Sequence, residues 1–407
     1  MLKSLAAGGS AATVLSSGVT AAEQSKTPGG SLENKTVYTG GDVQLGVPSK
    51  RSVSAVESGV DVGLFAAETG ESRKKQVQLL ENGATLCFLG NNANDTLAEL
   101  LTGIGRSNVA SGFEDGDASS ADDIDYSWGL EYDPKDGTYM AAVHPRGSKG
   151  VLDTHVYRRK TEESVGIADR ESKDATRRML SAVDRLLGKY DKNGNKVGVG
   201  TQELGGGFAP KCPGSSGWTC LGDSHVEDIH GKWGAYEKRV TGAVADGDHN
   251  RYFSFRVNQT ISASKNNDNI DGHGKNDSMK RKIDFNNATL RKHGPETTPG
   301  STTTSISVGI DSEGVANASW GWSSTSSNVR VVEDDMPTTE SVRHKWKISK
   351  GSSPALHSVQ GHPGYQAKTD LSTDTLRYDY KSVWWWYHLG GAISDNKKLT
   401  GSGNWSV

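Results

Sequence analysis

Two cysteines and two histidines lie close together near the middle of the chain. Cys212 and Cys220 enclose a short segment rich in Gly, Pro and Ser, and His225 and His230 follow. Two thiolates and two imidazoles could hold zinc in tetrahedral geometry. In an oxidising compartment, two cysteines across so short a loop more naturally form a disulfide. The spacing therefore favours a Cys212–Cys220 disulfide, with zinc as the alternative, while Cys87 is expected to be a buried, inert thiol.

Acidic residues gather between Arg106 and Lys135, where no basic residue intervenes. Carboxylates crowded on one loop repel one another unless a hard cation neutralises them, and calcium prefers six to eight oxygen ligands. Calcium is therefore the one cofactor that this pattern suggests, and a solvated acidic loop is the simpler interpretation. The candidate metal ligands are Asp115, Asp117, Asp122, Asp123 and Asp125.

Acid–base chemistry has one local candidate set, formed by His225, Glu227, Asp228 and His230. The chain contains no His-Glu-x-x-His, Gly-x-Ser-x-Gly or P-loop motif. Hydrolases that use paired carboxylates leave no signature in a single sequence. An extracellular hydrolase is therefore kept as an alternative to a non-catalytic protein.

Consecutive aromatic residues end a strand that is predicted to begin at Leu376. Successive side chains of a strand point to opposite faces, so this strand is either buried on both sides or has an aromatic outer face. Exposed rings would stack on sugars or lipid headgroups. The function indicated is non-catalytic binding of a macromolecule such as envelope glycan. The candidate ligand-binding residues are Trp320, Trp322, Trp384, Trp385, Trp386 and Tyr387.

Residues 305–323 predict a hairpin with one apolar and one polar face. Ile306 and Val308 alternate with Ser and Gly on the first strand, and Trp320 and Trp322 do so on the second. The pattern is similar to the stem hairpins of β-barrel pore-forming toxins. That resemblance implies a secreted membrane-active or antimicrobial protein. An ordinary half-solvated hairpin on a β-sandwich has the same pattern.

The elements that must position these residues are mostly short strands. Hydrophobic residues make up only 33% of the 407 residues and 50 residues are Gly, so much of the chain must be loop, turn or solvated surface. The fold class expected is mainly β, an antiparallel β-sandwich-like fold with one amphipathic helix and long polar loops. Early strands are predicted at 60–66, 75–80 and 84–89, and a hairpin joins 126–132 to 138–144. Later strands are predicted at 252–261, 305–310, 316–322, 329–332, 344–348 and 376–388, and a mobile polar loop at 265–282.

One helix has a clear apolar face, at residues 171–189, where Met179, Leu180, Val183 and Leu186 are expected to pack in the core. A short helix is also expected to open at the capping-box pattern of residues 96–99. The predicted organisation is an export signal at 1–21, an N-terminal α+β domain at 22–198, a Gly-rich linker with both cysteines at 199–223, and a C-terminal β-sandwich-like domain at 224–407.

The N-terminus predicts export. Lys3 precedes a weakly apolar stretch of small residues, and Val19-Thr20-Ala21 offers the side chains that a signal peptidase reads. The stretch resembles the body of a twin-arginine signal, although the paired arginines are missing. An extracellular or cell-surface location follows. Glycosylation sequons begin at Asn34, Asn94, Asn258, Asn276, Asn287, Asn317 and Asn404.

The leader and the Asn/Ser/Thr-rich β sequence together resemble uncharacterised exported β-rich proteins of halophilic archaea, although Lys is abundant and the net charge is only -3. That charge gives no general attraction to nucleic acid, so no nucleic-acid partner is expected. No apolar stretch is long enough for a transmembrane anchor. The partners expected are envelope glycan, lipid or a surface protein.

Overall fold

The structure is a computed structural model, and for residues 302–309, 319–326 and 329–338 it describes the backbone only. The described residues are 31–40, 43, 51–67, 72–90, 92–107, 126–132, 138–146, 150–159, 179–180, 182–184, 186–188, 190, 218–230, 234–263, 275–294, 302–309, 319–326, 329–349, 358–387 and 394–407. The chain forms two compact units. Unit 1 comprises Met1–Tyr126 and Pro134–Gly198, and unit 2 comprises Ser127–Asp133 and Val199–Val407.

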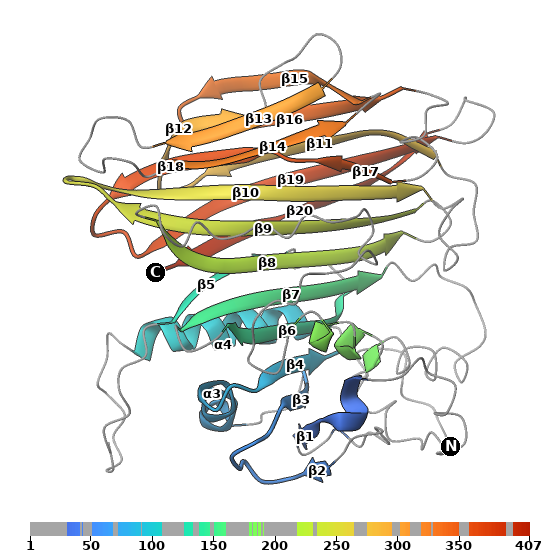
Figure 1. The fold of residues 1–407 in the computed structure, drawn as a ribbon, viewed down its shortest axis with the longest axis vertical. Helices are drawn as coiled ribbons and strands as arrows, with labels where there is room; N and C mark the ends of the chain where they lie inside the picture. Colours follow the sequence, from blue (N-terminus) through green and yellow to red (C-terminus); the bar gives the residue numbers. More distant parts are fainter. Residues whose placement is uncertain are drawn as a thin grey trace. The chain divides into compact units, whose positions relative to one another are not determined.

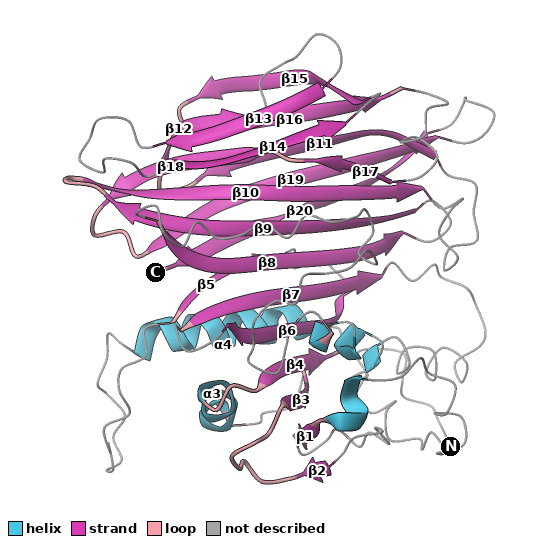
Figure 2. Cartoon of the chain, in the orientation of Figure 1, coloured by secondary structure: helices cyan, strands magenta, loops and turns pink. Residues whose placement is uncertain are grey.

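Unit 1 combines a mixed sheet with helices (Figures 1 and 2). Its strands run in the order β2–β1–β3–β4–β6–β7, parallel from β2 to β4 and antiparallel from β4 to β7. All residues of β3 and of β4 are buried, as is typical of parallel strands covered on both faces. The element bounds are η1 Ser31–Asn34, β1 Thr36–Thr39, β2 Arg51–Val53, β3 Val62–Ala66, α3 Arg73–Glu81, β4 Thr85–Leu89, α4 Ala93–Ser107, β6 Thr138–Arg146 and β7 Val151–Arg159.

The predicted strand at residues 75–80 is wrong, because this segment lies in helix α3. Its polar and apolar residues alternate locally, but Gln76, Leu79 and Leu80 are the buried positions. Spacings of three and four residues place them on one face of a helix. The helix connects parallel strands β3 and β4, a connection that needs a crossover rather than a hairpin.

The predicted amphipathic helix contributes to the unit 1 core where it is described. Met179, Val183 and Leu186 lie in helical segments and are buried in one cluster with residues of the sheet. Leu180 packs against the same cluster and is partly buried. The core-packing interpretation is therefore confirmed for these residues.

Unit 2 consists of antiparallel strands, so the predicted mainly-β fold is confirmed (Figure 2). One run pairs β8–β9–β10–β18–β12, with β17 also on β10, and the other pairs β5–β20–β19–β11–β16–β15. The bounds are β5 Ser127–Tyr132, β8 Thr219–His230, β9 Gly234–Asp246, β10 Asn250–Ala263, β11 Lys275–Phe285, β12 Thr289–Gly294, β13 Thr302–Gly309, β14 Ser319–Ser326, β15 Val329–Thr338, β16 Ser341–Ile348, β17 Ser358–Gly361, β18 Gly364–Asp370, β19 Thr375–Tyr387 and β20 Ser394–Ser406.

The two runs face each other across an aromatic core. The rings of Tyr236 on β9 and Trp384 on β19 stack with their centroids 3.8 Å apart. Phe255 on β10 lies 5.1 Å from Trp405 on β20, centroid to centroid. Unit 2 therefore has the two-layered arrangement of a β-sandwich.

Two further sequence predictions are wrong in unit 2. The expected hairpin of 126–132 with 138–144 does not form, because β5 pairs with β20 whereas β6 pairs with β4 and β7. The expected polar loop at 265–282 is wrong from residue 275 onward, where β11 begins, and in this strand buried and partly buried residues alternate except at Ser278 and Met279, which are both buried. Among the described residues no helix is long and apolar enough to cross a membrane.

Candidate functional site

The two strands of the hairpin predicted at residues 305–323 are present as β13 and β14, and they form a two-stranded sheet separate from the other strands. Its register places residues of similar polarity opposite each other. Ile306 lies opposite Trp322, and Val308 lies opposite Trp320. Between these positions, Ser307 is paired with Gly321. The apolar and polar positions of the two strands therefore coincide along the hairpin.

The predicted platform of consecutive aromatic residues is buried rather than exposed. Trp384 and Trp386 have no exposed surface, and Tyr387 is 7% exposed. Trp384 lies inside the sandwich on Tyr236, which explains its burial. An exposed stacking surface is therefore wrong for these three residues. Trp385 alone is partly exposed, and the Lys345 Nζ lies 5.9 Å from the centroid of its ring.

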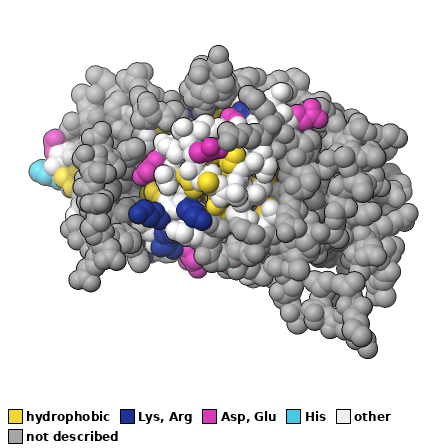
Figure 3. All heavy atoms as spheres, turned by 90° about the horizontal axis from the view of Figure 1, so that it is seen from below, with side chains coloured by type: hydrophobic (Ala, Val, Ile, Leu, Met, Phe, Trp, Pro, Cys, Tyr) yellow, Lys and Arg dark blue, Asp and Glu magenta, His cyan; other side chains and the backbone are white. Residues whose placement is uncertain are grey.

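Large exposed hydrophobic residues are few where burial is described. Leu371 and Val407 are the only ones, and neither is aromatic. On the described part of the face drawn in Figure 3, hydrophobic side chains show only in small areas among polar and charged ones. The side chains of Trp320 and Trp322 lie outside the described residues, so their ligand-binding role stays a prediction.

A buried ionic cluster lies in the interior of unit 2. The carboxylate of Glu131 on β5 forms two ion pairs. One oxygen contacts the Lys238 ammonium of β9, and the other lies 2.5 Å from the Arg281 guanidinium of β11. All three side chains have no exposed surface. The Lys238 ammonium also lies 3.7 Å from the centroid of the Tyr380 ring, a cation–π distance. One carboxylate thus forms ion pairs with two buried cations.

The cluster holds Glu131 in its ionised form. Burial by itself would raise the pKa of this carboxyl, but Arg281 and Lys238, together with hydrogen bonds from Lys238 and Tyr378, outweigh burial and lower the pKa to about 2. The Tyr378 hydroxyl donates to Glu131 and accepts a hydrogen bond of 3.0 Å from the Trp405 indole. Burial and the adjacent carboxylate raise the pKa of Tyr378.

Glycines make room for the rings around this cluster. A Cβ atom at Gly129 of β5 or at Gly242 of β9 would overlap the Trp405 ring. A Cβ atom at Gly403 of β20 would overlap the Tyr378 ring. These positions need the close approach that only Gly allows.

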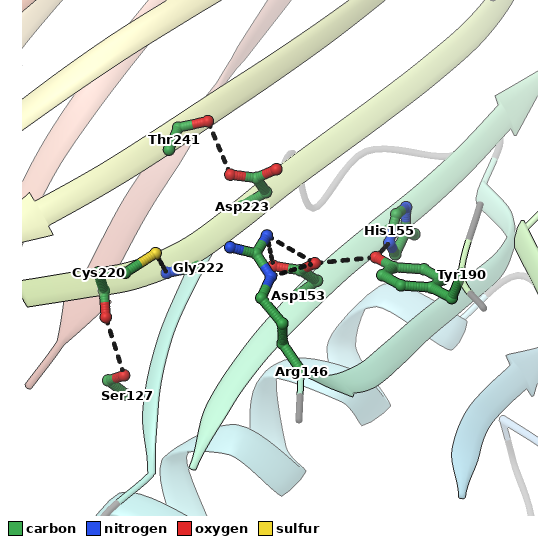
Figure 4. A network of polar contacts seen from close by, with 9 residues as sticks. All are labelled: Ser127, Arg146, Asp153, His155, Tyr190, Cys220, Gly222, Asp223 and Thr241. Atoms are coloured by element: carbon green, nitrogen blue, oxygen red, sulfur yellow. Dashed lines mark hydrogen bonds and ion pairs between the residues drawn. The ribbon is translucent and has the colours of Figure 1, made fainter. Parts of the chain in front are cut away.

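Unit 1 contains a second polar network, drawn in Figure 4. The guanidinium of Arg146 donates to both oxygens of Asp153, and the Tyr190 hydroxyl donates to the same carboxylate at 2.9 Å. His155 Nε2 lies 2.8 Å from that hydroxyl, and the His144 ring stacks on the Tyr190 ring at 3.6 Å. The network fixes Tyr190, which follows the helical segments of residues 179–187, to β7. In unit 2, Figure 4 shows Thr241 donating to Asp223 at 2.7 Å.

The remaining predicted site residues are only partly described. Asp115, Asp117, Asp122, Asp123 and Asp125 lie outside the described residues, and so does Cys212, so calcium binding and the disulfide to Cys220 stay predictions. Elsewhere in the described chain, no group of three or more His, Cys, Asp or Glu side chains could hold a metal ion.

Two predictions about single residues can be compared with the structure. Cys87 is a free, fully buried thiol, and burial raises its pKa to about 12, so it is inert as predicted. His225 is also fully buried, and its Nε2 lies 2.7 Å from Glu237 rather than facing solvent. A buried histidine held in this way is poorly placed to meet a substrate.

The buried ionic cluster could not be found by reading the sequence. Glu131 and Arg281 are 150 positions apart, and Glu131 and Tyr378 are 247 apart. The one local indication was a glutamate inside an otherwise apolar strand, Trp128-Gly129-Leu130-Glu131-Tyr132. An acid in such a place is expected to be paired.

Comparison with known proteins identifies no family. No protein-family model matches the chain, and no curated protein matches it. Among solved structures, "Pore forming protein" is similar at a TM-score of 0.32 and 8% identity, over 44% of this chain and 90% of that one. "Clostridium perfringens delta-toxin" is similar at 0.30 and 5%, over 46% and 89%. The C. perfringens NetB toxin in its membrane-inserted form is similar at 0.27 and 6%, over 44% and 94%. Likeness at this level carries no argument about function.

Proposed function

We propose that this chain is an exported, membrane-active protein and that the β13–β14 hairpin is its membrane-contacting element. The observation that carries the proposal is the separation of this hairpin from the other strands as its own two-stranded sheet. A hairpin held in this way can leave without breaking the strand pairing of the sandwich.

The register of the hairpin supports the same role. Apolar residues lie opposite apolar residues, as at Val308 and Trp320, and small polar positions lie opposite each other, as at Ser307 and Gly321. A strand in a membrane-spanning barrel needs this alternation, with the apolar residues toward lipid. Each strand has eight residues, close to the nine to eleven or so that cross a bilayer.

The test is dye release from liposomes by residues 22–407, with and without calcium. We expect leakage, and Val308→Asp should abolish it because a charge at a lipid-facing position is costly. Ser307→Asp is the matched control on the same strand, at a lumen-facing position, and should leave leakage largely intact. Equal activity of both variants, with both folded by circular dichroism, would refute the assignment of the hairpin.

Binding of an envelope glycan without catalysis is the second candidate function. The observation that favours it is Trp385, the one ring in the aromatic run that is partly exposed. Binding of envelope polysaccharide that is lost in Trp385→Ala, by a chain that causes no leakage, would favour this candidate. Conversion of the polysaccharide to products would instead indicate a hydrolase.

A further inference from the structure

Strand β5 belongs to unit 2, although the chain on both sides of it belongs to unit 1. The first part of unit 1 ends at Tyr126, and its second part begins at Pro134. The segment between them, Ser127–Asp133, belongs to unit 2. Every other strand of unit 2 lies after residue 199. The main body of unit 2 is therefore completed by six strand residues from a distant part of the sequence.

The main chain of β5 is held as an added strand. It pairs antiparallel with β20, in a register that sets Trp405 opposite Gly129 and Gly403 opposite Glu131. On its other side it runs beside β8, where the Glu131 amide donates to the Ser224 hydroxyl at 2.9 Å. Main-chain pairing of this kind supplies affinity without selecting a sequence.

Two side-chain positions on one face of β5 supply the selectivity. Gly129 and Glu131 are two residues apart, so both face the interior. The Trp405 ring occupies the space that any Cβ at residue 129 would need. Two residues along, Lys238 and Arg281 meet the Glu131 carboxylate in an environment without exposed surface. Only glycine at the first position and an acid two residues later can satisfy both positions.

We propose that the channel between β8 and β20 is a recognition site for an extended segment with Gly and Glu two residues apart, and that β5 is its built-in and exchangeable occupant. The site works by strand addition. Pairing with β20 fixes the register, the Trp405 ring excludes side chains at the first position, and the two cations select a carboxylate at the second. The channel has this selectivity whether or not the chain has the membrane activity proposed above.

The consequence is that the interior of unit 2 depends on a strand that unit 1 bounds at both ends. Loss of β5 from the channel removes the carboxylate that both cations contact. Burying a charge without its counter-charge is costly, so the channel favours being filled. Another segment with the same pattern, from a second chain, would satisfy it equally well.

The first test is binding of a fluorescein-labelled peptide with the sequence of residues 126–133 to the full chain. The wild-type chain should bind no peptide, because its own β5 fills the channel. The Gly129→Val chain should bind it, because the new side chain overlaps the Trp405 ring and disfavours the internal strand. Leu371→Ser, a change at an exposed position of unit 2, is the control chain and should bind none.

Peptide variants test the two selective positions. The peptide with Gln in place of its Glu should bind the Gly129→Val chain at least about tenfold more weakly, because a charge-assisted hydrogen bond is lost. The peptide with Val in place of Gly should not bind. Equal binding of all three peptides, or no binding by a folded Gly129→Val chain, would overturn the proposal.

Hydrogen exchange keeps the proposal testable if Gly129→Val does not fold. Glu131→Asp retains the charge but shortens the side chain by one methylene group. Exchange should rise at least about tenfold in β5 and at residues 402–406 of β20, while β3 and β4 of unit 1 exchange as in wild type. An unchanged rate in β5, or an equal rise in unit 1, would contradict the exchangeable-strand assignment.

Discussion

Replacing Gly242 with Ala should destabilise unit 2 through a single ring. The new Cβ would overlap the Trp405 indole, which has no exposed surface and is packed against Phe255. The ring is also held by its hydrogen bond to Tyr378, so it cannot move aside without losing that bond. Inserting a methyl group into a packed core costs about 1–3 kcal/mol. Replacing Gly by Ala also reduces the conformational entropy of the unfolded chain, which stabilises the folded state by about 0.4–1 kcal/mol. A net loss of about 1–2 kcal/mol is expected.

Tryptophan fluorescence during urea unfolding measures this loss in unit 2 alone. All ten Trp residues lie in unit 2, the first at position 128 and the rest after residue 199. The decisive comparison is a double-mutant cycle with Trp405→Phe, whose smaller ring leaves space for the methyl group. Gly242→Ala should cost less in the chain that already carries Trp405→Phe than in wild type. Costs that add within about 0.5 kcal/mol would refute the argument that the ring is the cause.

Buried groups give three further predictions. Unit 2 should lose stability as the pH falls from about 6.5 toward 4. Burial lowers the pKa of His344 to about 3 and that of His362 to about 4 in the folded chain. The unfolded chain therefore takes up these protons at a higher pH than the folded chain does. The loss is about 1.4 kcal/mol per histidine per pH unit, measured by urea unfolding at several pH values, and a flat profile would contradict it. In the native chain Cys87 should resist labelling by iodoacetamide, because it is buried. After unfolding without reductant, Cys87 should be the one cysteine labelled if Cys212 and Cys220 form a disulfide. Labelling of all three cysteines would rule that disulfide out. Asp153→Asn should destabilise unit 1 by about 2–3 kcal/mol. This is less than the loss expected on breaking a fully buried ion pair, because Arg146 is partly exposed. The rate of Cys87 labelling at increasing urea concentrations measures the loss.

Strands with a strong local pattern were predictable from the sequence. Residues 62–66 and 86–89 are continuous runs without a polar side chain, and residues 305–309 and 319–322 alternate with period two, so in these cases local sequence and environment agree. Strand β20 lacked such a pattern, since its apolar residues are Leu399 and Trp405 among Ser, Lys, Asn and Gly. It is a strand because β19 and β5 pair with it on both edges, and that pairing cannot be read from its own residues.

Burial was the part of the candidate site that the sequence could not decide. The aromatic run had two interpretations, a core strand and an exposed platform, and alternation alone permits both. The structure favours the core for Trp384 because Tyr236, 148 positions earlier, stacks on it. The Glu131 cluster was missed for the same reason, because its members meet only after distant strands have paired.

The insertion of β5 has a consequence for the timing of synthesis. Glu131 leaves the ribosome long before Tyr378, to which it is hydrogen-bonded across 247 positions. At about 5–20 residues per second, the wait lasts roughly 12–50 s. During that interval β5 has neither its partner strand nor the full set of contacts that neutralise its carboxylate. The growing chain therefore carries an unpaired strand edge for much of its synthesis, and a chaperone would have its greatest effect on yield in this period.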